Sequence, residues 1–79
     1  MLNLKDLFAK VMSVDRKIIN DDTSPENLSA WDSFNGLMLA SELEKNFNVK
    51  FTMEEINDIK KFSDIRKTLK KHGVKNGID

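Results

Sequence analysis

The chain of 79 residues has no cysteine, one histidine, one proline and three glycines. Without cysteine it can form neither a disulfide nor a thiolate zinc site, and it has no cysteine nucleophile, which fits a reducing compartment. Long apolar runs are also missing: the longest, LMLA, is far too short to span a membrane. The beginning, MLNLKDLF, lacks a basic segment followed by an apolar one, so no secretion signal is expected. These absences predict a soluble, cytoplasmic protein.

The length predicts one domain, residues 1–79, with a modest core and no room for an elaborate active site. We expect the last residues, about 74–79, to form a disordered tail.

The net charge is zero, but the two signs are sorted along the chain. Residues 20–64 carry ten acidic residues and four lysines, a balance of −6, while the segments before and after carry +2 and +4. A partner that approaches the middle of the chain would therefore benefit from being basic.

The spacing of apolar residues predicts helices joined by loops. In residues 3–12 apolar side chains recur at i, i+3, i+4, i+7 and i+8, with Asn3 as a plausible N-cap. These side chains are Leu4, Leu7, Phe8, Val11 and Met12. A second helix follows Asp32, and Gly36 allows close approach of a neighbour to it. Its predicted core stripe consists of Leu37, Ala40, Leu43 and Phe47.

Two further helices follow in the second half of the chain. Thr52 and Glu55 form a capping box for a short third helix. Ser63 is the predicted cap of a fourth helix that ends at Gly73. Its inward-facing residues are Ile65 and Leu69. The sequence thus predicts an all-α fold, a small four-helix bundle with three main helices and one short third helix.

A long loop, residues 13–31, separates the first two predicted helices. A structureless loop of that length is uncommon in a compact domain unless it is functional or held in place. Four apolar side chains could hold it: Ile18, Ile19, Leu28 and Trp31.

The usual catalytic and metal-binding patterns are not found. His72 is the only histidine, and it would have to fold back from a basic helix end to build a relay with Ser33. The acidic run DDTSPENLSAWD has the length of a calcium loop, but Glu26 takes the place of the turn glycine and Asp32 that of the bidentate glutamate. The glycines form no phosphate-binding loop. We therefore expect no enzyme activity and no metal.

Ser33 stands at the predicted start of the second helix and has two compatible interpretations. Either Asp32 or Ser33 caps the helix, because short polar side chains satisfy the amides of a first turn. In addition, a phosphate on the Ser33 oxygen would lie at the positive end of the helix dipole.

The residues around Ser33 resemble the acyl carrier protein family. The similarity rests on DSF followed by NGLMLASELEKNF and then VKFTMEEINDIKKFSDI, and it runs without a gap from about Trp31 to Leu69. In that family the serine after the aspartate carries 4′-phosphopantetheine, so the resemblance implies that Asp32 and Ser33 form the attachment site. It also explains the missing cysteine, since the prosthetic group would supply the thiol.

Departures from the family pattern concern partner recognition. Phe34 replaces the usual leucine, while Asn35 and Met38 stand where fatty-acid carriers commonly have acids. On a helical wheel Phe34 and Met38 lie at i, i+4, away from the core stripe, and form either an exposed apolar pair or a pair covered by a neighbouring segment. The acids available to basic partners are Glu42, Glu44, Glu54, Glu55 and Asp58, although charges of this kind usually form a solvated face.

The sequence leaves three functions open. The WDS motif resembles monomeric carriers of one dedicated lipid or secondary-metabolite pathway, loaded with a small acyl, aminoacyl or sugar-related group. The second is the general carrier of fatty-acid synthesis. For both, the implied partners are a phosphopantetheinyl transferase, an acyl-loading ligase or synthase and downstream acyltransferases, without membrane insertion. The third is an unmodified helical module that touches nucleic acid through RKTLKKHGVK, which the neutral net charge and the lack of aromatic residues there disfavour.

Overall fold

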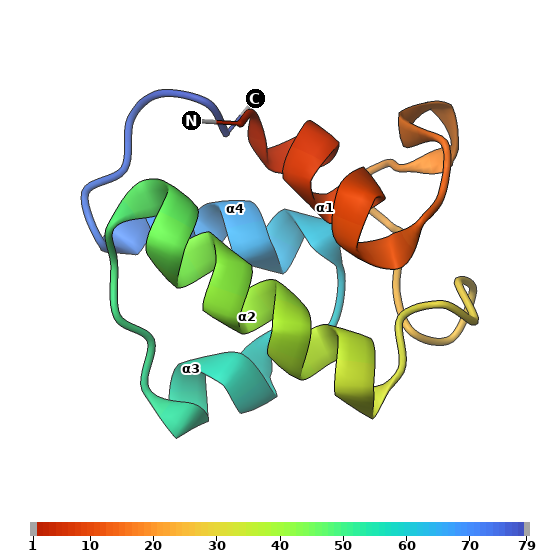
Figure 1. Ribbon diagram of the computed structural model, residues 1–79. Helices are drawn as coiled ribbons and strands as arrows, with labels where there is room; N and C mark the ends of the chain where they lie inside the picture. Colours follow the sequence, from red (N-terminus) through yellow and green to blue (C-terminus); the bar gives the residue numbers. More distant parts are fainter. Residues whose placement is uncertain (1, 79) are drawn as a thin grey trace.

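Residues 2–78 of the computed structural model are described, and within them the chain forms only helices and loops. The helices are α1 (Leu4–Met12), α2 (Ser33–Phe47), α3 (Met53–Asp58) and α4 (Phe62–Lys71), with a short 3-10 helix, η1 (Arg16–Ile18), in the first loop. Figure 1 shows α2 crossing in front of α4, with α1 at the upper right and the short α3 below. The predicted all-α bundle is confirmed. No helix among residues 2–78 is long and apolar enough to cross a membrane.

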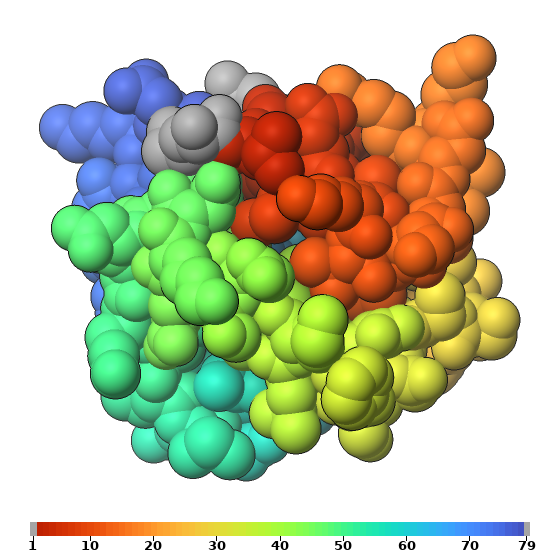
Figure 2. Space-filling model, in the orientation of Figure 1, coloured from red at the N-terminus to blue at the C-terminus, as the bar shows by residue number. Residues whose placement is uncertain are grey.

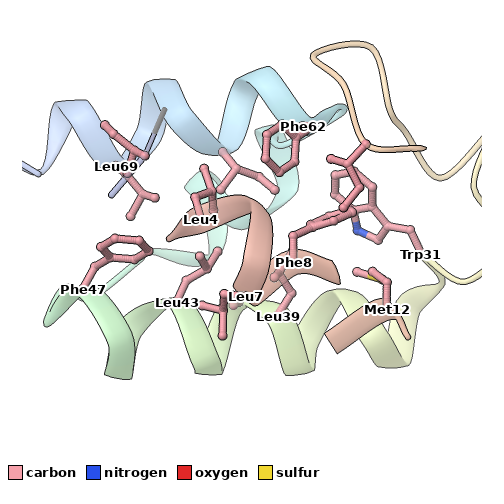
Figure 3. Packing of buried hydrophobic residues seen from close by; sticks show 14 of the residues in the cluster. Leu4, Leu7, Phe8, Met12, Trp31, Leu39, Leu43, Phe47, Phe62 and Leu69 are labelled. Carbon is pink, nitrogen blue, oxygen red and sulfur yellow. The ribbon is translucent and has the colours of Figure 1, made fainter. Parts of the chain in front are cut away.

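One hydrophobic core is shared by the main helices, and Phe8 of α1 lies at its centre. The Phe8 ring packs edge-to-face against Trp31 and against Phe62, in both cases with ring centroids 5.1 Å apart. Figure 3 shows these rings between α2 and α4. Such aromatic pairs add stabilisation beyond the area that they bury. The fully buried side chains are Leu4, Phe8, Leu43, Phe62, Ile65 and Leu69.

The predicted core stripe of α2 is wrong at one position. Ala40, Leu43 and Phe47 are buried as expected, but Leu37 is 58% exposed and Leu39, 3% exposed, takes its place. At 100° per residue, Leu37 lies roughly 100° around the helix from the centre of the buried face. It therefore stands at the edge of the core rather than inside it.

The helix starts confirm two predicted caps and correct a third. Asn3 caps α1, and Thr52 and Glu55 form the capping box of α3. Ser63 does not cap α4, which already begins at Phe62, after Lys61. The amides of Phe62 and Ser63 instead donate to carbonyl oxygens of residues 23 and 21 in the first loop, at 2.7 and 3.2 Å. Tertiary contacts thus replace the side-chain cap.

The loop of residues 13–32 is held in place at four points. Ile19 and Trp31 are buried and Leu28 packs half-buried against the core, as predicted, whereas Ile18 is 55% exposed and takes no part. Thr23 is the fourth point: it is buried, and its hydroxyl accepts a hydrogen bond from the amide of Asn20 at 2.9 Å. The sequence analysis did not single out Thr23, because its role depends on contact with α4.

The expected disordered tail is not observed for residues 74–78. Ile78 is 2% exposed and belongs to the core. Its carbonyl oxygen accepts a hydrogen bond from Nε of Arg66 at 2.7 Å, and the carbonyl of Gly77 accepts one from the amide of Leu4. Val74 also packs half-buried against the core, so two apolar residues hold a segment that is otherwise polar and glycine-containing. Asp79 lies outside the described residues.

Candidate functional site

Ser33 is the first residue of α2, and Asp32 is its N-cap. The Asp32 carboxylate accepts a hydrogen bond from the amide of Asn35 at 2.8 Å. The exposed Ser33 hydroxyl has no hydrogen-bond partner within residues 2–78, and neither do the amides of Ser33 and Phe34. Unpartnered first-turn amides and the positive end of the dipole favour a negatively charged group. This geometry fits a phosphate ester on the Ser33 oxygen.

Asn35 has a structural contact that explains why no acid stands there. Its Nδ2 donates to the carbonyl oxygen of Ala30 at 2.7 Å and so fixes the last residues of the loop against the start of α2. A carboxylate could not donate this hydrogen bond. Asn35 is half-buried, and this contact positions the backbone that precedes Ser33.

A cleft of about 570 Å³ opens beside Ser33 between α2 and α3. Ser33 and Asp32 lie in its lining, together with Trp31 and Gly36. The rest of the wall is largely apolar: Leu37, Leu39, Ala40, Leu43, Ile56 and Ile59. A group attached to Ser33 therefore has an apolar cleft beside its point of attachment, which the sequence analysis did not predict.

Exposed apolar side chains follow Ser33 along α2. Phe34 is 70% exposed, Leu37 58% and Met38 43%. These three residues are called the α2 patch below. Of the two alternatives left open for Phe34 and Met38, the structure has the exposed one. Figure 2 shows the start of α2, in yellow-green, at the molecular surface beside the first loop.

The acids expected to meet partners have different environments. Glu54 is exposed on α3 and Glu42 is half-buried on α2. Glu55 is held within the fold: its carboxylate accepts from the amide of Thr52 at 2.9 Å and lies 3.0 Å from Nε2 of His72 and 3.3 Å from Nζ of Lys71. These contacts, chiefly the Thr52 amide and then His72, lower the pKa of Glu55 to about 2. Glu55 thus joins α3 to the end of α4.

No catalytic relay or metal site forms among residues 2–78. His72 packs edge-to-face on Phe51 with ring centroids 5.6 Å apart, and its Nε2 meets Glu55 rather than Ser33. No group of three potential metal ligands occurs in this part of the chain.

Comparisons with known proteins agree with this geometry. The profile of a protein family described as phosphopantetheine attachment site matches residues 3–69. The fold is similar to the solution structure of a holo acyl carrier protein from Geobacter metallireducens, with a TM-score of 0.78 and 28% identity over 86% of this chain and 78% of that one. A search of curated protein sequences gave no match. The chain therefore belongs to the phosphopantetheine-attachment family and is a carrier protein of the acyl carrier type, with covalent 4′-phosphopantetheine as its cofactor, rather than an enzyme.

Proposed function

We propose that Ser33 is the attachment residue and that the chain presents one class of acyl group to the enzymes of a dedicated pathway. The observation that carries the proposal is the exposed, unpartnered Ser33 hydroxyl at the start of α2, beside an apolar cleft. Other serines of the chain lack this combination of helix start, unpartnered amides and neighbouring cleft.

Attachment is a phosphoryl transfer in which the Ser33 oxygen is the nucleophile. A bond forms between Oγ of Ser33 and the phosphorus that bears the pantetheine arm of coenzyme A. The phosphoanhydride bond breaks, adenosine 3′,5′-bisphosphate leaves, and the hydroxyl proton passes to a base of the transferase. The unpartnered amides of Ser33 and Phe34 would be available to donate to oxygens of the phosphodiester.

The bound prosthetic group supplies a thiol on which cargo is held as a thioester. The residues of this chain then determine where the cargo rests. Leu39, Leu43 and Ile56 offer apolar surface in the cleft, so a hydrocarbon portion of the cargo gains by leaving water there. The attachment at Ser33 places the base of the arm in the cleft lining.

The α2 patch favours a dedicated pathway over general fatty-acid synthesis. Phe34, Leu37 and Met38 are exposed beside Ser33, and the acids that fatty-acid carriers commonly place there are absent. Buried apolar contacts usually contribute most of the free energy of an interface, whereas charges at its rim mainly affect the rate of encounter. A loading ligase or acyltransferase that uses this carrier should therefore offer an apolar depression to the α2 patch, with basic residues near Glu54.

Incubation with coenzyme A and a phosphopantetheinyl transferase of broad specificity tests the attachment. Intact-mass spectrometry should show one phosphopantetheine on the parent and on Ser29→Ala, whose serine is also exposed, and none on Ser33→Ala. Modification that survives Ser33→Ala would move the site elsewhere. No modification of the parent would favour an unmodified binding module.

The pathway is tested with the modified parent and two sets of enzymes. Purified fatty-acid synthesis enzymes should use the carrier poorly, and an acyl-loading ligase encoded beside it should use it well. Equal or better use by the fatty-acid enzymes would instead assign the chain to general fatty-acid synthesis.

A further inference from the structure

Trp31 carries a hydrogen-bond donor that the fold does not use. The indole is only 6% exposed, and one side of its ring packs edge-to-face on Phe8. Within residues 2–78, Nε1 has no hydrogen-bond partner, although indole N–H groups usually find one when buried. A donor whose hydrogen bond the protein does not satisfy is available to a ligand that can accept it.

The indole nitrogen of Trp31 faces the cleft. No fully buried side-chain nitrogen or oxygen in the described part of the chain lacks a partner, so the unpartnered Nε1 must keep some contact with solvent. Trp31 lines the cleft next to Ser33 and Gly36. Figure 3 shows the nitrogen, in blue, on the side of the ring that faces α2.

Gly36 leaves space in front of this nitrogen. A Cβ atom at position 36 would lie 3.5 Å from Nε1 and 3.8 Å from Cδ1 of Trp31. Those distances are ordinary van der Waals contact, so a side chain there would fit but would narrow the approach to the donor. Glycine at this position keeps open the path from the cleft to the indole N–H.

We infer that the Trp31 indole N–H donates a hydrogen bond to an oxygen of the prosthetic group or of its cargo when that group lies in the cleft. The inference rests on the proposed attachment at Ser33, which lies in the same cleft lining. The acceptor is a phosphate, carbonyl or hydroxyl oxygen, because the indole can only donate. Because the rest of the cleft is largely apolar, this donor favours a ligand oxygen beside Trp31 over an oxygen elsewhere in the cleft. It therefore favours cargo, or a conformation of the arm, that places an oxygen beside Trp31.

Nuclear magnetic resonance can observe this donor alone, because Trp31 is the only tryptophan. The indole N–H signal is compared in four ¹⁵N-labelled samples: the unmodified chain, the chain with phosphopantetheine only, and chains loaded with hexanoyl or 3-hydroxyhexanoyl groups. A hydrogen bond moves the proton signal downfield and slows its exchange with water. A change that begins with phosphopantetheine alone assigns the oxygen to the arm. One that begins with hexanoyl assigns it to the thioester, and one found only with 3-hydroxyhexanoyl assigns it to the cargo hydroxyl.

Two variants serve as controls. Gly36→Ala should keep the fold, since alanine favours helix, but should reduce the downfield shift by narrowing the approach to Nε1. Trp31→Phe keeps an aromatic ring against Phe8 and removes the donor. In the Trp31→Phe variant, the state in which the arm or cargo lies in the cleft should become roughly fivefold less populated, as expected for loss of one hydrogen bond. The methyl signals of Ile56 and Ile59, which line the cleft, report this population.

The outcomes separate this inference from the proposed function. Absence of phosphopantetheine at Ser33 in the mass spectrum contradicts the proposed function itself. Successful modification and loading without any response of the indole signal overturns only the role of Trp31. Slower exchange of the indole proton with water, without a downfield shift, would mean that apolar groups cover the N–H without accepting a hydrogen bond. That result also overturns the inference.

Discussion

The carboxylate of Glu55, in the first turn of α3, lies 3.0 Å from Nε2 of His72, just after α4. This contact joins a helix of six residues to the end of a helix of ten, and α3 forms one wall of the cleft beside Ser33. Short helices are marginal on their own and depend on tertiary contacts. The position of the cleft wall therefore depends in part on Glu55.

Stability should depend on pH through Glu55. Its pKa falls from the ordinary 4.5 to about 2 in the folded chain, so its stabilising contribution is complete above 4.5 and is lost as the pH falls toward 2. Urea unfolding of the parent and Glu55→Gln should show a gap in free energy that narrows as the pH falls from about 4.5 through about 2. Glu54→Gln, at an exposed neighbour, should show no such gap. A constant gap for Glu55→Gln would mean that its charged contacts do not contribute.

Leucines on two faces of α2 should differ sharply in their contribution to stability. Leu43 is 1% exposed and Leu37 58% exposed. Leu43→Ala should lower the free energy of unfolding by about 2–5 kcal/mol, and Leu37→Ala by less than about 0.5 kcal/mol. Chemical denaturation measures both. A large loss of unfolding free energy for Leu37→Ala would support the buried face predicted from the sequence, which included Leu37, and contradict the observed one.

Phe47→Ala should be among the most damaging changes in α2. Phe47 is 8% exposed at the end of the buried face, and removal of a core phenylalanine typically costs about 3–5 kcal/mol, a large share of the stability of so small a domain. The variant should be largely unfolded at ordinary temperature. A cooperative thermal transition close to that of the parent would show that the contact is dispensable.

The C-terminal segment should also contribute to folding. Ile78 is buried, while Lys75 in the same segment is exposed. Ile78→Ala should lower the free energy of unfolding by about 2–5 kcal/mol, and Lys75→Ala by less than about 0.5 kcal/mol. Equal, small effects in thermal and urea unfolding would indicate a disordered tail after all.

Much of this fold could be predicted because local rules decided it. The apolar spacing placed Leu4, Phe8 and Leu43 in the core, and the TMEE pattern gave the capping box of α3. The failures share a physical cause. The start of α4, the anchor Ile78 and the exposed Leu37 are set by contacts between segments distant in sequence, which periodicity does not report.

The geometry of the candidate site was predictable to a similar extent. Ser33 stood out because a short polar residue began an amphipathic helix within a recognisable pattern, and its neighbours Phe34 and Met38 followed from the same helix. The cleft and the direction of the Trp31 nitrogen could not be predicted from the sequence, because they depend on how α3 packs beside α2. Glu55 showed two roles in one residue, a cap that the sequence predicts and a contact with His72 that only the fold reveals.

Recognition by partners should respond to the α2 patch. Met38→Glu places a charge in the apolar patch and should reduce kcat/KM for the chain's own loading enzyme by about tenfold or more, while improving use by fatty-acid enzymes. Glu54→Gln should mainly reduce the salt dependence of association. Steady-state assays over a range of salt concentrations measure both effects. Unchanged native loading of Met38→Glu would exclude Met38 from the interface.

The attachment of cargo at Ser33 is tested most directly on the chain isolated from cells that make it. Fragmentation of the intact protein in a mass spectrometer should place a phosphopantetheine that bears an acyl group on the fragment containing Ser33, and the mass of that group would identify the cargo. The same chain with Ser33→Ala should carry nothing. Unmodified Ser33 in the parent under conditions of active biosynthesis, or an acyl-bearing arm on another residue, would contradict the account.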